Sequence, residues 1–266
     1  MAPTPRRATG CFPAISALAV TIAFAAALGG CGSRLGDITG SVTTPNPDTS
    51  PRQRAADIAA RYQAQPGNPE IAIEYARVLR ASGQRAQAVA VLQQASMQAP
   101  RNQAVLAEYG RALAEAGHYQ QALEVMSKAH TPDQPDWRLL NAQGAVLDQM
   151  GNHAEARRYY ETALKIAPAE PTILSNLGLS YALSKELVRA EQTLRRAVAQ
   201  TGADIRVRQN LALVLGLQGK FAEAEKIAAS DLPPDEARAN VAYLREMLKQ
   251  RDPLKTISAP KKPKRV

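Results

Sequence analysis

Small and large apolar residues recur along most of the chain with a period of 34 residues. Small residues form one series at Ala76, Gly110, Gly144, Gly178 and Ala212, and a second at Ala88, Ala122, Ala156, Ala190 and Ala224. Large apolar residues keep the same interval at Leu79, Leu113, Leu147, Tyr181 and Leu215. Self-similarity at a fixed period of about 20–50 residues is typical of repeat architectures, so the five copies are interpreted together.

Each copy predicts two antiparallel helices joined by a tight turn. The turn falls on Gly83, Gly117, Gly151 and Gly219. Glycine tolerates the positive φ that ends a helix, and Lys185 is the one exception in this series. Small residues on both helices allow a close crossing, so Gly144 and Ala156 are expected to face each other. Asn68 and Asn102 precede two of the first helices as candidate N-caps.

The fourth copy, ILSNLGLSYALSKELVRAEQTLRRAV, shows the pattern most completely. Leu177-Gly178 and Tyr181 lie on its first helix, and Ala190 and Leu194 lie on its second. This pattern resembles the tetratricopeptide repeat, and the resemblance covers residues 69–231 in five copies. It implies an all-α fold, a right-handed superhelix of helix-turn-helix repeats. A single copy cannot bury its apolar face, so stacked neighbours form the core.

Two further helices are predicted at the ends of the repeats. Residues 52–65 and 234–251 carry apolar residues at helical spacing, which indicates amphipathic helices that cap the terminal copies. The predicted repeat domain therefore spans residues 51–251.

The resemblance also implies a binding surface, because the first helices of such repeats line a concave groove. Groove-lining positions hold Arg77, Arg111, Asn141, Asn176, Leu179, Leu183, Arg206, Asn210, Leu213 and Leu217. These residues grade from charged to apolar along the chain, with asparagines between. An asparagine amide can both donate to and accept from the backbone of an extended peptide, and exposed aliphatic patches usually mark interfaces. The alternative is that these residues are only solvated or packed. The Lys and Arg set of dicarboxylate-clamp adaptors is absent, so that specificity is not expected.

Composition agrees with an all-α protein that binds other proteins. The chain is 45% hydrophobic but only 5% aromatic, which favours closely packed helices. Its net charge of +9 is concentrated at the ends, since residues 249–266 hold seven Lys and Arg against one Asp. Without these and without Arg6 and Arg7, 24 basic and 23 acidic residues remain. A nucleic-acid partner is therefore not expected.

No set of residues predicts catalysis, a metal or a cofactor. His118, His130 and His153 fall in turns or at helix ends without the spacing of a metal site. A phosphate-binding loop and a nucleophile motif are also missing from the sequence. We expect a binding protein and not an enzyme.

The N-terminus is typical of a targeting segment. Arg6 and Arg7 precede an apolar run from Ala14 to Leu28, so residues 1–30 are predicted to be a signal peptide. Leu28-Gly29-Gly30-Cys31 resembles a bacterial lipobox, which implies that Cys31 is lipidated after cleavage. The alternative is an uncleaved signal anchor with an incidental cysteine. Residues 31–50 are rich in Gly, Ser, Thr and Pro and are expected to form a flexible tether.

The order of these parts suggests a more specific family. A lipobox, a short tether, the repeats and the segment DLPPDEARANVAYLREML together resemble the lipoproteins of the Tad (tight adherence) pilus system, known as TadD. The resemblance implies a lipid-anchored assembly factor for Flp pili that acts with an outer-membrane secretin or other pilus components. Because Gly32 is not the Asp that retains lipoproteins in the inner membrane, we expect the periplasmic face of the outer membrane. The alternatives are a general envelope scaffold for cell-wall enzymes, a part of another secretion machine, and a sugar-polymer export lipoprotein. Residues 252–266 are expected to be a basic disordered tail.

Overall fold

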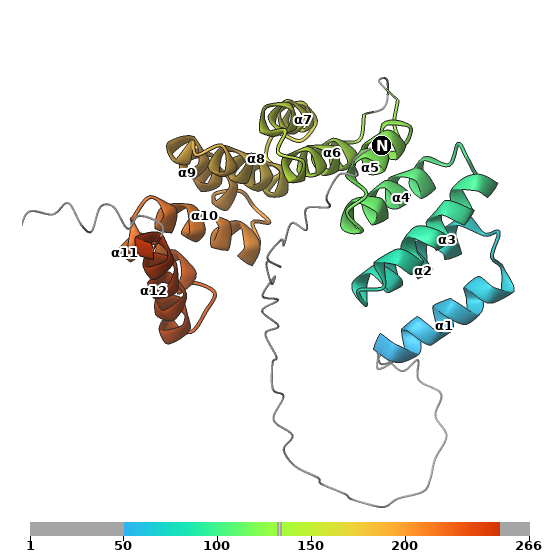
Figure 1. Ribbon diagram of the computed structural model, residues 1–266, viewed down its shortest axis with the longest axis horizontal. Coiled ribbons are helices and arrows are strands. Elements are labelled where there is room, and N and C mark those ends of the chain that lie inside the picture. Colours follow the sequence, from blue (N-terminus) through green and yellow to red (C-terminus); the bar gives the residue numbers. More distant parts are fainter. Residues whose placement is uncertain (1–50, 132, 134, 251–266) are drawn as a thin grey trace, which may run out of the picture. The chain divides into compact units, whose positions relative to one another are not determined.

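The computed structural model describes residues 51–131, 133 and 135–250, and these residues form twelve α-helices and no β-strand (Figure 1). The predicted all-α class is confirmed. In this part of the chain no helix is both long and apolar enough for a membrane span. The predicted signal peptide (1–30), the tether with Cys31 (31–50) and the basic tail (252–266) lie outside the described residues.

The helices follow the period found in the sequence. The first helices of the five copies are each 13 residues long and begin 34 residues apart. They are α2 (Pro69–Ala81), α4 (Gln103–Glu115), α6 (Trp137–Gln149), α8 (Pro171–Leu183) and α10 (Ile205–Leu217). The second helices are α3 (Arg85–Gln98), α5 (Tyr119–Ser127), α7 (His153–Ile166), α9 (Leu187–Val198) and α11 (Phe221–Ala228). Helix α1 (Pro51–Ala64) precedes the copies and α12 (Pro234–Gln250) follows them.

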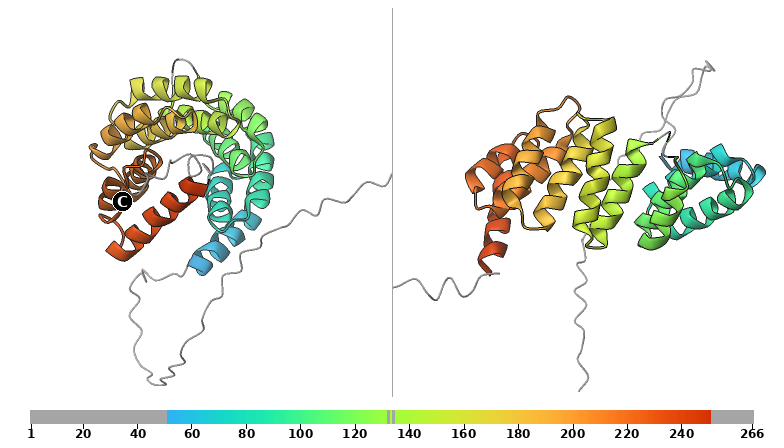
Figure 2. Two further views of the ribbon diagram at one scale, coloured as in Figure 1. Left: turned by 60° about the vertical axis from the view of Figure 1, so that its left-hand side comes forward. Right: turned by 90° about the horizontal axis from the view of Figure 1, so that it is seen from above.

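Each helix packs against its neighbours in the chain, and the first helices of successive copies also pack against one another. Figure 2 shows this succession of paired helices in two further views. The first helices therefore form a continuous row, and this row carries the predicted groove residues.

An acceptor side chain fixes the start of every first helix. The N-cap residues are Asn68, Asn102, Asp136, Glu170 and Asp204, again 34 residues apart. Each accepts backbone N–H groups of the first helical turn at 2.8–3.2 Å. Such a cap contributes about 1 kcal/mol to helix stability.

The second helices start differently, because the turn itself sets their position. No side-chain cap bond is found at their N-termini. Instead, the backbone N–H of the residue before the second helix donates to a carbonyl near the end of the first, as from Asn152 to Leu147 at 2.9 Å. The chain can turn back this sharply only through a positive φ, which is +81° at Gly151. Lys185 holds the same place in the fourth copy with φ +65°.

The two helices of a copy cross at a glycine in the three central copies. A Cβ atom on Gly144 would lie 2.6 Å from the ring of Tyr160, and one on Gly178 would lie 2.6 Å from Leu194. The large side chain of the second helix therefore rests directly on the backbone of the first. The sequence placed Ala156 opposite Gly144, whereas the group nearest to this glycine belongs to Tyr160, one helical turn further on.

The third copy contains a polar residue that its neighbours lack. Gln143 is 2% exposed, and its Oε1 has no hydrogen-bond partner among the described residues. The corresponding residues of the other copies are Tyr75, Tyr109, Leu177 and Leu211. An unsatisfied buried carbonyl costs about 1–3 kcal/mol, so the third copy is less stable than the sequence period alone predicts.

The positive φ at Lys185 generates a prediction. Replacing Lys185 with Gly removes the steric penalty of a β-carbon in the left-handed region and should stabilise the fold by about 1 kcal/mol. The measurement is thermal unfolding followed by circular dichroism. Lys226→Gly is the matched control, because Lys226 lies inside α11, where glycine should destabilise by about 1 kcal/mol. A loss of stability in both variants would contradict the assignment of Lys185 to the strained turn position.

Candidate protein-interaction surface

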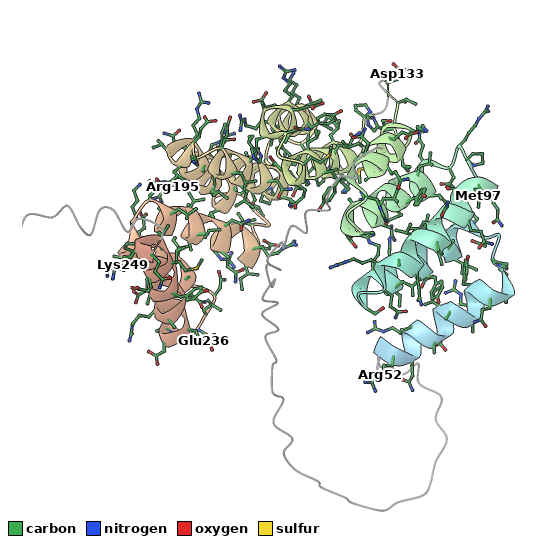
Figure 3. All side chains as sticks on the ribbon, viewed as in Figure 1. Arg52, Met97, Asp133, Arg195, Glu236 and Lys249 are labelled. Carbon is green, nitrogen blue, oxygen red and sulfur yellow. The ribbon has the colours of Figure 1, made fainter. Side chains whose placement is uncertain are left out.

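All ten residues predicted to line a groove lie on the row of first helices. The structure places them on α2, α4, α6, α8 and α10, and none belongs to the fully buried core. Leu183 and Leu213 are 56% and 42% exposed, which is unusual for leucine in a helical stack. Figure 3 shows the side chains that project from these helices. We call this row of side chains the inner surface.

At the α2–α4 end, the inner surface is organised around one buried carboxylate. Glu108 on α4 is 5% exposed, and three arginines surround it. Its oxygens lie 2.8 Å from Arg77 Nη2, 2.7 Å from Arg80 Nη1 and 3.0 Å from Arg111 Nη1. Arg80 also pairs with Glu115, at the end of α4. A surface cavity of about 440 Å³ opens between these side chains.

The charges of this cluster largely neutralise one another. Burial raises the pKa of Glu108, but the hydrogen bond from Arg77 and the charges of Arg111, Arg77 and Arg80 outweigh burial and hold this pKa below its usual range. The hydrogen bond to Glu115 is the main reason why the pKa of Arg80 is raised. Arg77 and Arg111 therefore have their charges compensated by Glu108 inside the protein. The repeat spacing predicts both arginines for the groove, but it does not predict that they share one carboxylate.

The asparagines of the inner surface bond to neighbouring copies. Asn176 Nδ2 on α8 donates to Asn141 Oδ1 on α6 at 3.0 Å, and Asn210 Nδ2 on α10 donates to Ser175 Oγ at 2.9 Å. Within the described residues, the amide oxygens of Asn176 and Asn210 accept no hydrogen bond. These two oxygens can accept backbone N–H groups of a bound peptide, since each carbonyl has two lone pairs.

The α8–α10 end of the inner surface is apolar. Leu179 and Leu217 are half-buried, while Leu183 and Leu213 are largely open to solvent. Arg206, at the start of α10, is exposed and pairs with its neighbour Asp204 at 3.0 Å. The predicted gradation from charged to apolar side chains is thus a gradation from internally paired charges to exposed leucines.

A serine, a histidine and an aspartate meet between α6 and α8, but they cannot form a catalytic triad. Ser180 Oγ and His153 Nδ1 both bond to Asp148 Oδ1 at 2.8 Å, so the serine contacts the acid and not the base. Ser180 is fully buried. Tyr160 also donates to Asp148 at 2.9 Å, and burial together with this carboxylate raises the pKa of Tyr160 strongly. The four side chains join two successive copies.

The comparisons with known proteins agree with the geometry of a helical-repeat interaction protein. Family models described as tetratricopeptide repeat match residues 52–107, 116–169 and 149–214. These ranges together cover more than half of the chain, so the chain belongs to the tetratricopeptide-repeat family. Repeats of this family form protein–protein interaction scaffolds, and neither model describes a catalytic family.

Solved structures show the same fold. The TTC0263 protein of Thermus thermophilus is 21% identical with a TM-score of 0.57, over 66% of this chain and 98% of that one. The pilF protein of Pseudomonas aeruginosa is 21% identical with a TM-score of 0.53, over 76% and 85%. A chain of the APC/C hetero-tetramer Cut9-Hcn1 is 15% identical with a TM-score of 0.61, over 78% and 43%. The predicted tetratricopeptide-repeat superhelix is confirmed. No curated protein sequence matches the chain.

The family and structure matches do not test the predicted lipidation of Cys31 or the expectation that no metal is bound. Cys31 lies outside the described residues. Among the residues that the structure does describe, no group of three His, Cys, Asp or Glu side chains could hold a metal ion.

The buried carboxylate of the charged cluster generates a prediction. Replacing Glu108 with Gln keeps its shape but leaves Arg77 and Arg111 without their counter-charge and Arg80 with Glu115 alone. It should destabilise the protein by about 2 kcal/mol at pH 7. Because the folded-state pKa of Glu108 is below the ordinary 4.5, its stabilising effect is complete above about pH 4.5 and is lost as the pH falls through that lowered pKa. The difference between wild type and Glu108→Gln should therefore shrink in acid. Chemical denaturation at several pH values measures this.

Glu124 provides the matched control for this prediction. Its carboxylate pairs with Lys128 on the surface of α5, with both side chains more than 60% exposed. Glu124→Gln should leave the stability almost unchanged, because solvent screens an exposed ion pair. Equal effects of the two substitutions would show that Glu108 is not the centre of a buried network.

Proposed function

We propose that this protein is a scaffold whose inner surface binds an extended segment of another protein. The supporting observation is the pair Leu183 and Leu213, which are exposed on helices whose other large apolar residues are mostly buried. Exposed aliphatic side chains release water when a partner covers them, which favours binding, and a few well-packed contacts carry most of the energy of an interface. The unused amide oxygens of Asn176 and Asn210 on the same helices would orient the backbone of the segment.

We further propose that the scaffold is anchored by lipid at the periplasmic face of the outer membrane. This proposal depends on the motif Leu28-Gly29-Gly30-Cys31, on the apolar run before it and on Gly32 after it. Residues 31–50 would then act as a tether between the lipid and α1, and their composition suits a flexible chain.

The partner that we propose is a component of a Flp or Tad pilus assembly machine, such as its outer-membrane secretin. The order of lipobox, tether, repeats and the segment DLPPDEARANVAYLREML supports this proposal, and the last part of it forms α12. The likeness to the pilF protein is one of fold at 21% identity, so the pilus proposal depends on the layout of the sequence.

Binding at the exposed leucines can be tested in cells. Leu183→Asp combined with Leu213→Asp would place unpaired charges in the interface, and should abolish both surface pili and co-purification of the secretin. Ile166→Asp combined with Val188→Asp is the matched control, because these residues are 41% and 65% exposed on second helices. Circular dichroism should show full helicity in both double variants. Undiminished secretin recovery with the folded Leu183→Asp and Leu213→Asp variant would rule out the apolar end of the inner surface as the binding site.

Lipidation is tested separately. Metabolic labelling with a palmitate analogue should mark the wild-type protein, whereas Cys31→Ser should lose the label and leave the membrane fraction. The reason is that only a thiol can carry the diacylglycerol, and the other cysteine, Cys11, lies within the predicted signal peptide. Label retained by the Cys31→Ser protein would contradict this part of the proposal.

A further inference from the structure

Helix α12 follows the last copy and was expected to act as a cap. It packs against α10 and α11, the two helices of the fifth copy, and Figure 2 shows it beside them. The first helix of each copy packs in this way on the two helices of the copy before it. The relation suggests that α12 occupies the place of a sixth first helix, although neither family model extends beyond residue 214.

The contacts fix the register of α12. We number each first helix from its first residue, so that position 1 is Trp137 in α6, Pro171 in α8 and Ile205 in α10. Asp148, at position 12 of α6, bonds to Ser180, at position 10 of the next first helix. Gly216, at position 12 of α10, has Leu244 against it, since a Cβ there would lie 2.3 Å from Leu244 Cδ2. Leu244 therefore holds position 10 of α12.

The burial pattern of α12 agrees with this register. Counting back from Leu244 puts Ala237 at position 3 and Val241 at position 7, and these side chains are 0% and 9% exposed. The same positions are also buried in α8 and α10, where they hold Ile173, Leu177, Val207 and Leu211. Helix α12 therefore packs on the fifth copy with the same face that α8 uses to pack on the third copy and α10 on the fourth.

The register then identifies the residues that α12 adds to the inner surface. Position 6 holds an asparagine in all three helices: Asn176, Asn210 and Asn240. Position 9 holds Leu179, Leu213 and Tyr243. Position 13 holds Leu183, Leu217 and Met247. Three rows of like side chains therefore cross α8, α10 and α12.

The exposure of Tyr243 and Met247 is contrary to a capping role. They are 69% and 44% exposed, whereas the outer face of a terminal cap is normally polar for solubility. Large exposed apolar side chains that continue an existing apolar patch indicate an interface. Glu236 and Lys249, labelled in Figure 3 near the two ends of α12, are charged and exposed but lie outside the three rows.

We infer that α12 lines the inner surface, and that α8, α10 and α12 together bind an uncharged extended segment with apolar side chains. This inference rests on the proposed function. The nine residues of the rows include no charge. The inner-surface charge on α10, Arg206, is already paired with Asp204 at 3.0 Å. A charged side chain over the rows would therefore lose water without gaining a partner. The amide oxygens of Asn176 and Asn210 are unused, and Asn240 makes no side-chain hydrogen bond within the described residues, so the middle row can bind main-chain groups.

The spacing of the helices sets the length of the segment. Packed helices lie about 8–10 Å apart, so crossing from α8 to α12 covers about 20 Å. An extended chain rises about 3.3 Å per residue, so about six residues span the three helices.

The test uses the purified full-length chain and a fluorescein-labelled, end-blocked decapeptide in which Leu alternates with Ser and Thr. Fluorescence anisotropy measures its affinity. Leu213→Asp, Tyr243→Asp and Met247→Asp should each weaken binding about tenfold, because hot-spot losses are of this order. Ala242→Asp is the matched control on α12, since Ala242 is exposed outside the three rows, and it should leave the affinity unchanged. A second decapeptide with two Leu replaced by Glu should bind about tenfold more weakly than the first.

The outcomes separate this inference from the proposed function. If Leu213→Asp weakens binding but Tyr243→Asp and Met247→Asp do not, α12 is only a cap, and the inference fails while the proposed function stands. If the Glu-containing peptide binds as well as the uncharged one, the assigned partner chemistry is wrong. If neither peptide binds, the inner surface is not a peptide site and both proposals fail. If sedimentation shows a dimer that Tyr243→Asp dissociates, the surface holds a second copy of this chain and the inference is overturned.

Discussion

The close crossing of the two helices within each copy is the contact on which the rest of the structure depends. At Gly144 the ring of Tyr160 occupies the space that a Cβ atom would need. This contact brings the helix axes together and lets Tyr160 reach the polar cluster at Asp148, which bonds in turn to Ser180 of the next copy. Protein interiors are closely packed, so the crossing angle of the two helices within a copy fixes the angle at which the next copy packs against it. The row of first helices, and the surface that it presents, follow from that geometry.

The polar groups of the inner surface have more hydrogen-bond and ion-pair partners within the protein at one end than at the other. Near α2 and α4, three arginines and two glutamates pair with each other, so a partner would have to replace bonds that the protein already makes. Near α8 and α10, Leu183 and Leu213 are open to solvent, and the asparagine oxygens have no donors among the described residues. Burial of these groups gains free energy without breaking an internal pair. The apolar end is therefore where binding costs least, and α12 extends that same end.

The sequence predicts most of the fold because each feature of a copy has a local cause. The 34-residue interval gives the helices, the turn glycines give their ends, and the N-cap residues Asn68 and Asn102 give their starts. Even the exceptional Lys185 takes the conformation that its place in the period requires. The nearest neighbour of Gly144 was less predictable. A helical side chain leans toward the N-terminus of its helix, so the large ring of Tyr160 lies over the turn that contains Ala156.

The sequence predicts which residues form the candidate surface, but not which of them pair with one another. Spacing puts Arg77, Glu108 and Arg111 on neighbouring helices, yet only their side-chain geometry shows that the carboxylate is shared. The role of α12 could not be found from the period, because the helix begins at Pro234, five residues before the next copy would start, and its alignment appears only in the contact of Gly216 with Leu244.

The most direct test of the account is hydrogen–deuterium exchange of the protein with and without the decapeptide in which Leu alternates with Ser and Thr. Exchange reports which helices a partner covers, independently of any substitution. The account predicts that slowing of exchange is confined to α8, α10 and α12, with α7, α9 and α11 unchanged. Protection concentrated on these second helices, or on α1, would contradict the central claim that the row of first helices forms the binding surface.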